Sequence, residues 1–363
     1  MYNFTNLTFP FEFYGFSALD RYFDIVSVEV PLLAVTPADP AAIARETDSI
    51  SFPGVPGVDA EAYMDDTRVL FRCSDKDGGL LKKDIPALEF RYVPSRRVFR
   101  DPAGVYYQLR RRELDLDSLE SGIYSWSTIA ELAVLASRYS FSLPVPAEYP
   151  PQEVALPLFL QRLYLSYILT GKNPAAGMNF LMKSGFIGLH WPELLPLDKI
   201  DHSKEYHPEG NVWNHTLETF SYRKTRDLVL SLALLLHDIG KSRSVENEGN
   251  RFDRHAQIGG GMAVHFLRRI GFSDPLAEDV RFLVSRHMMP AMIAKLPVFR
   301  TEDTMNHRLF PLLLEVYRCD ISSTFRGPDG YYEACRAYRE FLKNRKNPYR
   351  TTAGKKLFRT YVE

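Results

Sequence analysis

Four histidines and two aspartates in the second half of the chain could bind divalent metal ions. The most informative segment is "LLLHDIGK", residues 234–241, where His237 and Asp238 follow a strongly apolar run. A carboxylate that enters an apolar core without a partner is destabilising, so the sequence must supply something for this aspartate to bind. A metal ion would suit the pair. The remaining candidates, in chain order, are His215, His255, His287 and Asp320.

The ligand types narrow the choice of ion. Imidazole and carboxylate together favour borderline or hard divalent ions such as Mn, Ni, Fe, Mg or Zn. The cysteines Cys73, Cys319 and Cys335 have no metal-ligand spacing, which argues against a structural zinc site. Four imidazoles and two carboxylates are enough ligands for one ion or for two.

A helix must position the His237–Asp238 pair. Adjacent residues on a helix point about 100° apart, so both could serve one ion only from a special place such as a helix end. The sequence predicts that the apolar helix ends here. Gly240 is predicted to form a left-handed C-terminal cap. Lys241 would lie beside the negative helix end, within reach of a substrate phosphate.

Composition indicates a globular protein with no membrane partner. Lys and Arg balance Asp and Glu, 45 against 45, which gives no overall electrostatic case for a nucleic-acid partner. Residues 1–70 nevertheless carry eleven acids and three bases, whereas residues 321–363 carry ten bases and four acids. A solvated helix face explains such a basic run more often than a phosphate contact does. Reduced cysteines, together with the absence of a secretory signal and of a run of roughly 20 apolar residues, predict a cytoplasmic protein.

The elements change character along the chain. "YFDIVSVEV" and "ALEFRYV" have strand-like content, and "TPADPAAIARE" predicts a turn and a short helix. Helical periodicity begins with "STIAELAVLASRY", and everything after Leu156 is expected to be α. The expected fold class is therefore α+β, a mixed α/β N-terminal domain followed by an all-α region.

The ordered set of candidate ligands resembles the HD superfamily of metal-dependent phosphohydrolases. A lone histidine is more often a hydrogen-bonded core residue, and this interpretation is kept for His190, His202, His265 and His307, which have no place in the pattern. The flanking segments "HPEGNVWNHTLE", "RFDRHAQIGG" and "FLVSRHMMP" look like the HD domain of bacterial tRNA nucleotidyltransferases, the CCA-adding and poly(A) polymerase family. The resemblance implies a nucleotidyltransferase-like domain over residues 1–115, a helical neck over 116–200, an HD domain over 201–330 and a basic helical tail over 331–363.

The N-terminal domain departs from that family where polymerase chemistry would lie. In "GFSALD", Phe16 and Leu19 replace a glycine and an arginine of the family's glycine-rich loop. "FDIVSV" offers Asp24 and then Val26 where the family has two alternating aspartates. Asp65 and Asp66 of "YMDD" are a displaced pair with weaker support. We therefore interpret this domain as degenerate and inactive as a polymerase.

The resemblance implies a metal-dependent phosphohydrolase acting on a nucleotide or an RNA end. His215, His237, Asp238 and Asp320 would form one metal site, and Asp238 would bridge to a second ion held by His255 and His287. Lys241 would stabilise the phosphate charge, with Arg254 and Arg286 as weaker candidates for phosphate contact. Two alternatives stay open. One is a tRNA nucleotidyltransferase with divergent motifs, and the other is a non-catalytic RNA- or nucleotide-binding protein with a regulatory metal site. Oligomeric state is not predictable from the sequence.

Overall fold

The computed structural model describes residues 7–26, 29–64, 67–73, 85–114, 125–143, 155–201, 210–244, 254–325 and 327–346. The chain divides into two compact units, Met1–His190 and Trp191–Glu363. Each unit has its own apolar core. The domain boundaries predicted at residues 115, 200 and 330 remain predictions.

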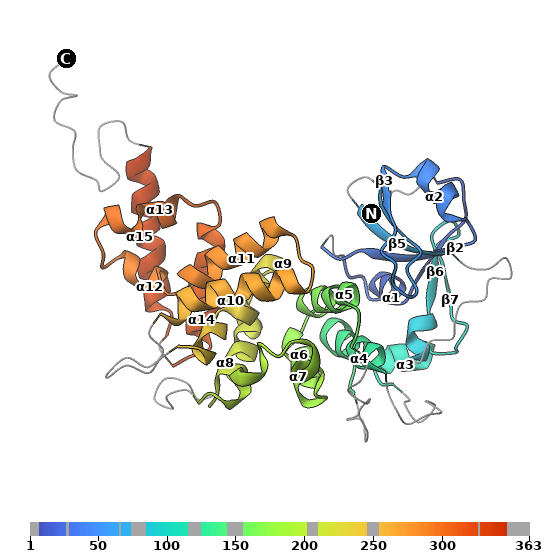
Figure 1. Cartoon of the computed structure of the whole chain (residues 1–363), viewed down its shortest axis with the longest axis horizontal. Coiled ribbons are helices and arrows are strands. Elements are labelled where there is room, and N and C mark those ends of the chain that lie inside the picture. The colour runs from blue at the N-terminus through green and yellow to red at the C-terminus, as the bar shows by residue number, and fades with distance from the viewer. Residues whose placement is uncertain are drawn as a thin grey trace, which may run out of the picture. The chain divides into compact units, whose positions relative to one another are not determined.

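A seven-stranded mixed sheet forms the centre of the first unit (Figure 1). The strand order is β3-β4-β5-β2-β1-β6-β7, and all neighbours are antiparallel except β2 and β5. The strands are β1 Glu12–Tyr14, β2 Leu32–Thr36, β3 Ser49–Ser51, β4 Ala60–Met64, β5 Thr67–Cys73, β6 Arg91–Val93 and β7 Val98–Arg100.

The strand predicted in "YFDIVSVEV" is wrong. The segment spans residues 22–30, of which 27 and 28 lie outside the described part. Tyr22 is the last residue of helix α1, residues 23–26 and 29–30 are in no strand, and the next strand begins at Leu32. Asp24 has a φ of 53°, which interrupts any extended segment. Strand β2, "LLAVT", is buried along its whole length, as expected for a strand in the middle of a sheet.

Helices complete the first unit. Helix α2 has Asp39 as its N-cap, in agreement with the predicted turn and short helix. Helix α1 contacts β1, β2 and β6, and its Phe16 ring lies 5.0 Å from that of Tyr167 on α5. The helices are α1 Phe16–Tyr22, α2 Pro40–Glu46, η1 Pro86–Glu89, α3 Tyr106–Arg111, α4 Trp126–Tyr139, α5 Leu158–Leu169, α6 Pro174–Lys183 and α7 Phe186–His190.

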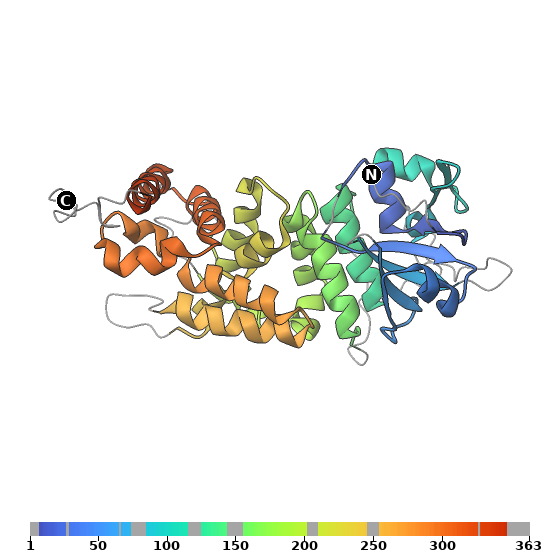
Figure 2. The same ribbon diagram turned by 90° about the horizontal axis from the view of Figure 1, so that it is seen from above.

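The second unit is helical. Helices α10 and α11 lie side by side and are joined by a short turn (Figure 2). The helices are η2 Leu195–Lys199, α8 Val212–Thr219, η3 Phe220–Tyr222, α9 Leu228–Leu236, η4 Ile239–Ser242, α10 His255–Arg269, α11 Asp274–Arg286, α12 Pro290–Ile293, α13 Val298–Asn306, α14 Phe310–Ser322 and α15 Asp329–Arg345. The α+β class is confirmed. The first unit combines a mixed sheet with helices, and every element described after residue 156 is a helix. Among the described residues, no helix has the length and apolar content that a membrane span requires.

Candidate metal centre

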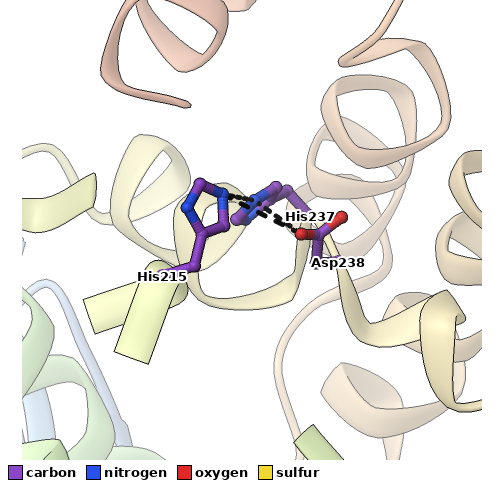
Figure 3. Close-up of side chains that lie close together, drawn as sticks. All are labelled: His215, His237 and Asp238. Carbon is purple, nitrogen blue, oxygen red and sulfur yellow. Dashed lines mark hydrogen bonds and ion pairs between the residues drawn. The ribbon is translucent and has the colours of Figure 1, made fainter. Parts of the chain in front are cut away.

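Five helices of the second unit bring the six predicted ligands together. His215 lies on α8, the His237–Asp238 pair follows α9, His255 begins α10, His287 follows α11 and Asp320 lies on α14. His215, His237 and Asp238 each offer a ligand atom within 4.8 Å of the others, and so do Asp238, His255 and His287. Figure 3 shows the first of these triads, with its side chains turned toward one another. The two triads share Asp238.

The contacts between ligand atoms are short. The Nε2 atom of His215 lies 3.0 Å from Oδ1 of Asp320 and 3.4 Å from Nε2 of His237. The Nε2 atom of His255 lies 3.2 Å from Nε2 of His287 and 3.4 Å from Oδ1 of Asp238. Asp238 turns its other oxygen, Oδ2, toward His237 at 3.3 Å. One carboxylate thus faces both halves of the cluster.

The helix end places His237 and Asp238, as predicted. Helix α9 starts at the N-cap Asp227 and ends at Leu236, with His237 still in helical geometry. Asp238 then turns to φ −104° and ψ 6° and starts the 3-10 helix η4. The change of direction allows two adjacent residues to face one site.

The role predicted for Gly240 is wrong in its mechanism. Gly240 does not have a positive φ, so it is not a left-handed cap. Glycine is needed at this position because there is no space for a side chain. A Cβ atom there would lie 2.0 Å from the carbonyl oxygen of His255 and 2.6 Å from the amide nitrogen of Gly259. Glycine therefore allows η4 to approach the start of α10, which brings His255 toward Asp238.

Hydrogen bonds fix the tautomers of three rings. The Nδ1 atom of His237 lies 2.8 Å from the Leu234 carbonyl oxygen, and that of His287 lies 2.7 Å from the Val284 carbonyl oxygen. A carbonyl only accepts, so each Nδ1 carries the hydrogen and each neutral ring leaves a lone pair on Nε2. His215 has the same arrangement. The Ser323 hydroxyl donates to the Asp320 carbonyl oxygen and therefore accepts from Nδ1 of His215, at 3.2 Å.

These tautomers make the centre a fitting cation site. The lone pairs of His215 and His237 face each other, and that of His215 also faces the Asp320 carboxylate, with no hydrogen atom between them. Acceptors directed at one another in a buried place repel unless a cation lies among them. Imidazole Nε2 atoms oriented through Nδ1, together with carboxylates, are the usual surroundings of a protein-bound divalent metal ion.

Burial and charge keep the ligands in their binding forms. His215, His237, Asp238 and His287 are all buried. Burial alone would raise the pKa of Asp238, but the Lys241 ammonium and His237 hold this pKa well below its usual range. Burial would raise the pKa of Asp320 as well, but the neighbouring His215 and His237 hold it below its usual range. Burial lowers the pKa of His287 to about 4. At neutral pH the carboxylates are ionised and His287 is neutral, as metal binding requires.

The basic residues near the centre differ in how they are placed. The Lys241 ammonium lies 2.6 Å from Oδ2 of Asp238, and its side chain is only 10% exposed. Its predicted contact with a substrate phosphate remains a prediction, and in the structure Lys241 balances the charge of a ligand. Arg254, beside His255, is exposed. Arg286, which precedes His287, is exposed as well.

Ser323 was not identified from the sequence. It orients His215 through Nδ1, which is how residues behind a metal ligand commonly act. A local signal was present, because Ser323 follows Asp320 by three residues on the same helical turn. A hydroxyl at that spacing from a ligand is placed to reach a second ligand beside it.

The first unit offers no comparable group of ligands among its described residues. Strand β2, which follows α1, contains no acid. The strands contain two acids, and both pair with arginine: Glu12 lies 2.7 Å from Arg100, and Glu61 lies 2.6 Å from Arg68. The pair Asp65 and Asp66 falls outside the described residues.

Comparison with known proteins agrees with the site. The HD domain family matches residues 211–322, so the chain carries an HD domain. The chain is similar to the A-adding tRNA nucleotidyltransferase of Deinococcus radiodurans, at 28% identity over 63% of this chain and 56% of the relative. It is similar to the CC-adding tRNA nucleotidyltransferase of Thermus thermophilus, at 31% identity over 34% and 30%. A bifunctional uridylyltransferase/uridylyl-removing enzyme of Mycobacterium tuberculosis matches at 27% identity over 48% and 20%.

Solved structures include similar chains. The CCA-adding enzyme of Bacillus stearothermophilus in complex with CTP aligns with a TM-score of 0.48 and 14% identity, over 93% of this chain and 79% of that one. The family model and the curated relatives confirm the predicted resemblance to the HD domain and to the tRNA nucleotidyltransferases. The chain spans 56% of the length of the first of these relatives and 30% of the second. The HD domain and these relatives imply a divalent metal.

Proposed function

We propose that the chain is a metal-dependent phosphohydrolase that cleaves a phosphomonoester or phosphodiester of a nucleotide or an RNA end at its HD domain. One observation carries the proposal. Four imidazole Nε2 atoms and two carboxylates converge, and in three of the rings the Nδ1 hydrogen is already used by a neighbour. Such a set is typical of sites for divalent cations.

The residues have separable roles in this proposal. His215, His237, Asp238 and Asp320 would hold one ion, and His255 and His287 would hold a second that shares Asp238. Bound ions of this kind activate water and neutralise phosphoryl charge. Lys241 supplies a cation beside Asp238 that would favour a phosphate in the site, and Ser323 keeps the ring of His215 oriented.

The names of the curated relatives favour the alternative, tRNA nucleotidyl transfer, over hydrolysis. One of these names also couples uridylyl transfer with uridylyl removal, and removal of a nucleotidyl group is the kind of cleavage proposed here. Transfer by the first unit is therefore the second candidate function. It would require a carboxylate pair for metal ions, and the strand acids of the described residues are paired with arginine.

The first experiment tests hydrolysis by substituting, one at a time, two histidines of helix α10. Metal content is measured by elemental analysis of the purified chain, together with its hydrolysis of a generic phosphodiester, a 2′,3′-cyclic nucleotide and a nucleoside monophosphate under Mn, Ni or Mg. His255→Ala should lose the second ion, together with turnover. His265→Ala, an exposed position on the same helix α10, should keep both. Equal turnover in the two variants would contradict the proposal.

The second experiment separates hydrolysis from transfer. A tRNA that lacks its terminal nucleotides is incubated with labelled ATP and CTP and either the wild-type chain or Asp238→Ala. Incorporation by both proteins, without hydrolysis by either, would favour the transferase. Bound metal without either reaction would favour a non-catalytic binding protein.

A further inference from the structure

An exposed group of arginines lies at one edge of the sheet in the first unit. Residues 91–112 contain seven arginines and a single acid, Asp101. Strand β7 is the edge strand, and α3 is the next helix along the chain (Figure 1). We call the following exposed residues the arginine surface: Arg96, Arg97, Arg100, Tyr107, Arg110, Arg111 and Arg112.

Aromatic packing holds the two parts of the arginine surface together. Phe99 of β7 and Tyr106 of α3 contact the same two rings. Their ring centroids lie 5.4 Å and 5.2 Å from that of Phe90, and 5.7 Å and 5.9 Å from that of Tyr22. The arginines of the β6–β7 turn and those of α3 are therefore anchored to one cluster, and they form a surface rather than a run in sequence alone.

Most of this positive charge has no acidic partner in the described part of the chain. Glu12 pairs with Arg91 and Arg100. The carboxylate of Asp101 instead accepts hydrogen bonds from the backbone amides of Val105 and Tyr106. Within the described ranges, no ion pair is formed by Arg96, Arg97, Arg110, Arg111 or Arg112. Residues 1–70 carry eleven acids and three bases, so the run of arginines over residues 91–112 contrasts with the beginning of the first unit.

The backbone gives an independent indication that the arginine side chains matter. Arg97 has a φ of 55° and Arg112 a φ of 56°, in the left-handed region that glycine and asparagine adopt with less strain. The conformation of these two turns would be better served by glycine. Arginine at both positions therefore carries a backbone cost, and a function of the side chain would account for it.

We infer that the arginine surface binds the phosphate backbone of a single-stranded nucleic acid. Guanidinium groups pair with phosphates in bidentate geometry. Tyr107 is 62% exposed, and the guanidinium of Arg111 lies 4.3 Å from the centroid of its ring. A base could stack on the exposed part of such a ring, and exposed aromatics beside cationic tracks are typical of single-strand binding. The proposed hydrolysis at the HD domain is not needed for this inference.

Protection of the sheet edge against pairing with another sheet would account for only part of the arginine surface. Charged residues on an edge strand hinder its pairing with another sheet, which would explain Arg100 on β7. It would not explain Arg110 and Arg111 on a helix, nor the strained Arg97. The neutral overall composition gave no electrostatic case for a nucleic-acid partner, because whole-chain charge averages over opposite local surpluses.

The test measures binding of the full chain to a fluorescein-labelled, unstructured RNA of about 15 nucleotides by fluorescence anisotropy. Arg96→Gln/Arg97→Gln/Arg110→Gln/Arg111→Gln should raise Kd at least about tenfold at low salt. The slope of log K against log salt should become less negative by about 3, since each phosphate contact on a single strand contributes about 0.7. Tyr107→Ala should raise Kd with no change of that slope. Single-stranded DNA of the same sequence should also bind if the backbone is the target.

A matched control removes the same charge elsewhere. Arg336→Gln/Arg339→Gln/Arg345→Gln/Lys346→Gln alters exposed residues at α15 and should leave Kd within about twofold of wild type. Arg97→Gly relieves the strained turn, so weaker RNA binding without a fall in Tm would exclude misfolding as the cause. Equal weakening in both quadruple variants, or binding to anionic vesicles but not to either nucleic acid, would overturn the inference.

Discussion

Asp20 and Arg138, 118 positions apart, form a buried bidentate ion pair in the first unit. Nε of Arg138 lies 2.6 Å from Oδ1 of Asp20, and Nη2 lies 2.7 Å from Oδ2. The Tyr139 hydroxyl lies 2.8 Å from the same Oδ1. Asp20 ends the segment "GFSALD", where the resemblance places the glycine-rich loop of a nucleotidyltransferase. Both of its oxygens are occupied by groups that join α1 to α4, so this acid has a structural role.

Removing Asp20 should therefore destabilise the protein severely. Asp20→Ala leaves the Arg138 guanidinium buried without its counterion, and we expect the free energy of unfolding to fall by about 3–5 kcal/mol. Urea denaturation measures the change. The double variant Asp20→Leu/Arg138→Met should lose less, because it leaves no buried charge unpaired. A loss below about 1 kcal/mol in the single variant would show that the pair is not important for folding.

Ser323 should control metal affinity through His215. Ser323→Ala removes the hydroxyl that accepts from Nδ1 of His215 and frees the ring to rotate or change tautomer. Loss of such a supporting group typically weakens metal binding by about 10- to 100-fold. Titration of the chelator-treated protein with Mn or Zn by isothermal calorimetry would measure it. Ser322→Ala, one position away on α14, should leave the affinity unchanged; comparable weakening there would mean that helix α14, and not the hydroxyl, is responsible.

The ligands were predictable from the sequence because they depend on residue type and on one local feature, the end of an apolar helix. His237 and Asp238 lie at that end as expected. The α+β class followed in the same way from periodicity. The two predictions that were wrong, the left-handed cap at Gly240 and the strand in "YFDIVSVEV", concern features that depend on contacts between distant segments. The space requirement of Gly240 arises from α10, which begins at His255, and the central strand "LLAVT" is selected over "YFDIVSVEV" by its neighbours in the sheet.

The metal-free protein should lose stability in mild acid. Burial lowers the pKa of His287 in the folded state to about 4, against an ordinary value of 6.5. Between these values the unfolded chain binds a proton that the folded chain does not, so stability falls as the pH decreases from 6.5 to about 4, by roughly 1 kcal/mol per pH unit. Urea midpoints of chelator-treated protein across this range measure the slope. In His287→Gln the slope should be smaller, and an unchanged slope would assign the effect to other groups.

Alanine substitutions at Gly240, which packs against α10, and at Gly261, which lies within α10, should change the stability of the protein in opposite directions. In Gly240→Ala the new Cβ would lie 2.0 Å from the His255 carbonyl oxygen, so η4 and α10 must separate. We expect a loss of at least about 2 kcal/mol in the free energy of unfolding, together with weaker metal binding because His255 moves away from Asp238. Gly261→Ala adds a Cβ with no atom within 4 Å in a helix interior, and it should stabilise the protein by up to about 1 kcal/mol. Thermal and urea unfolding of both variants, with metal titrations, make the comparison. If Gly240→Ala unfolds like wild type and binds metal normally, the close approach of η4 to α10 does not position the centre.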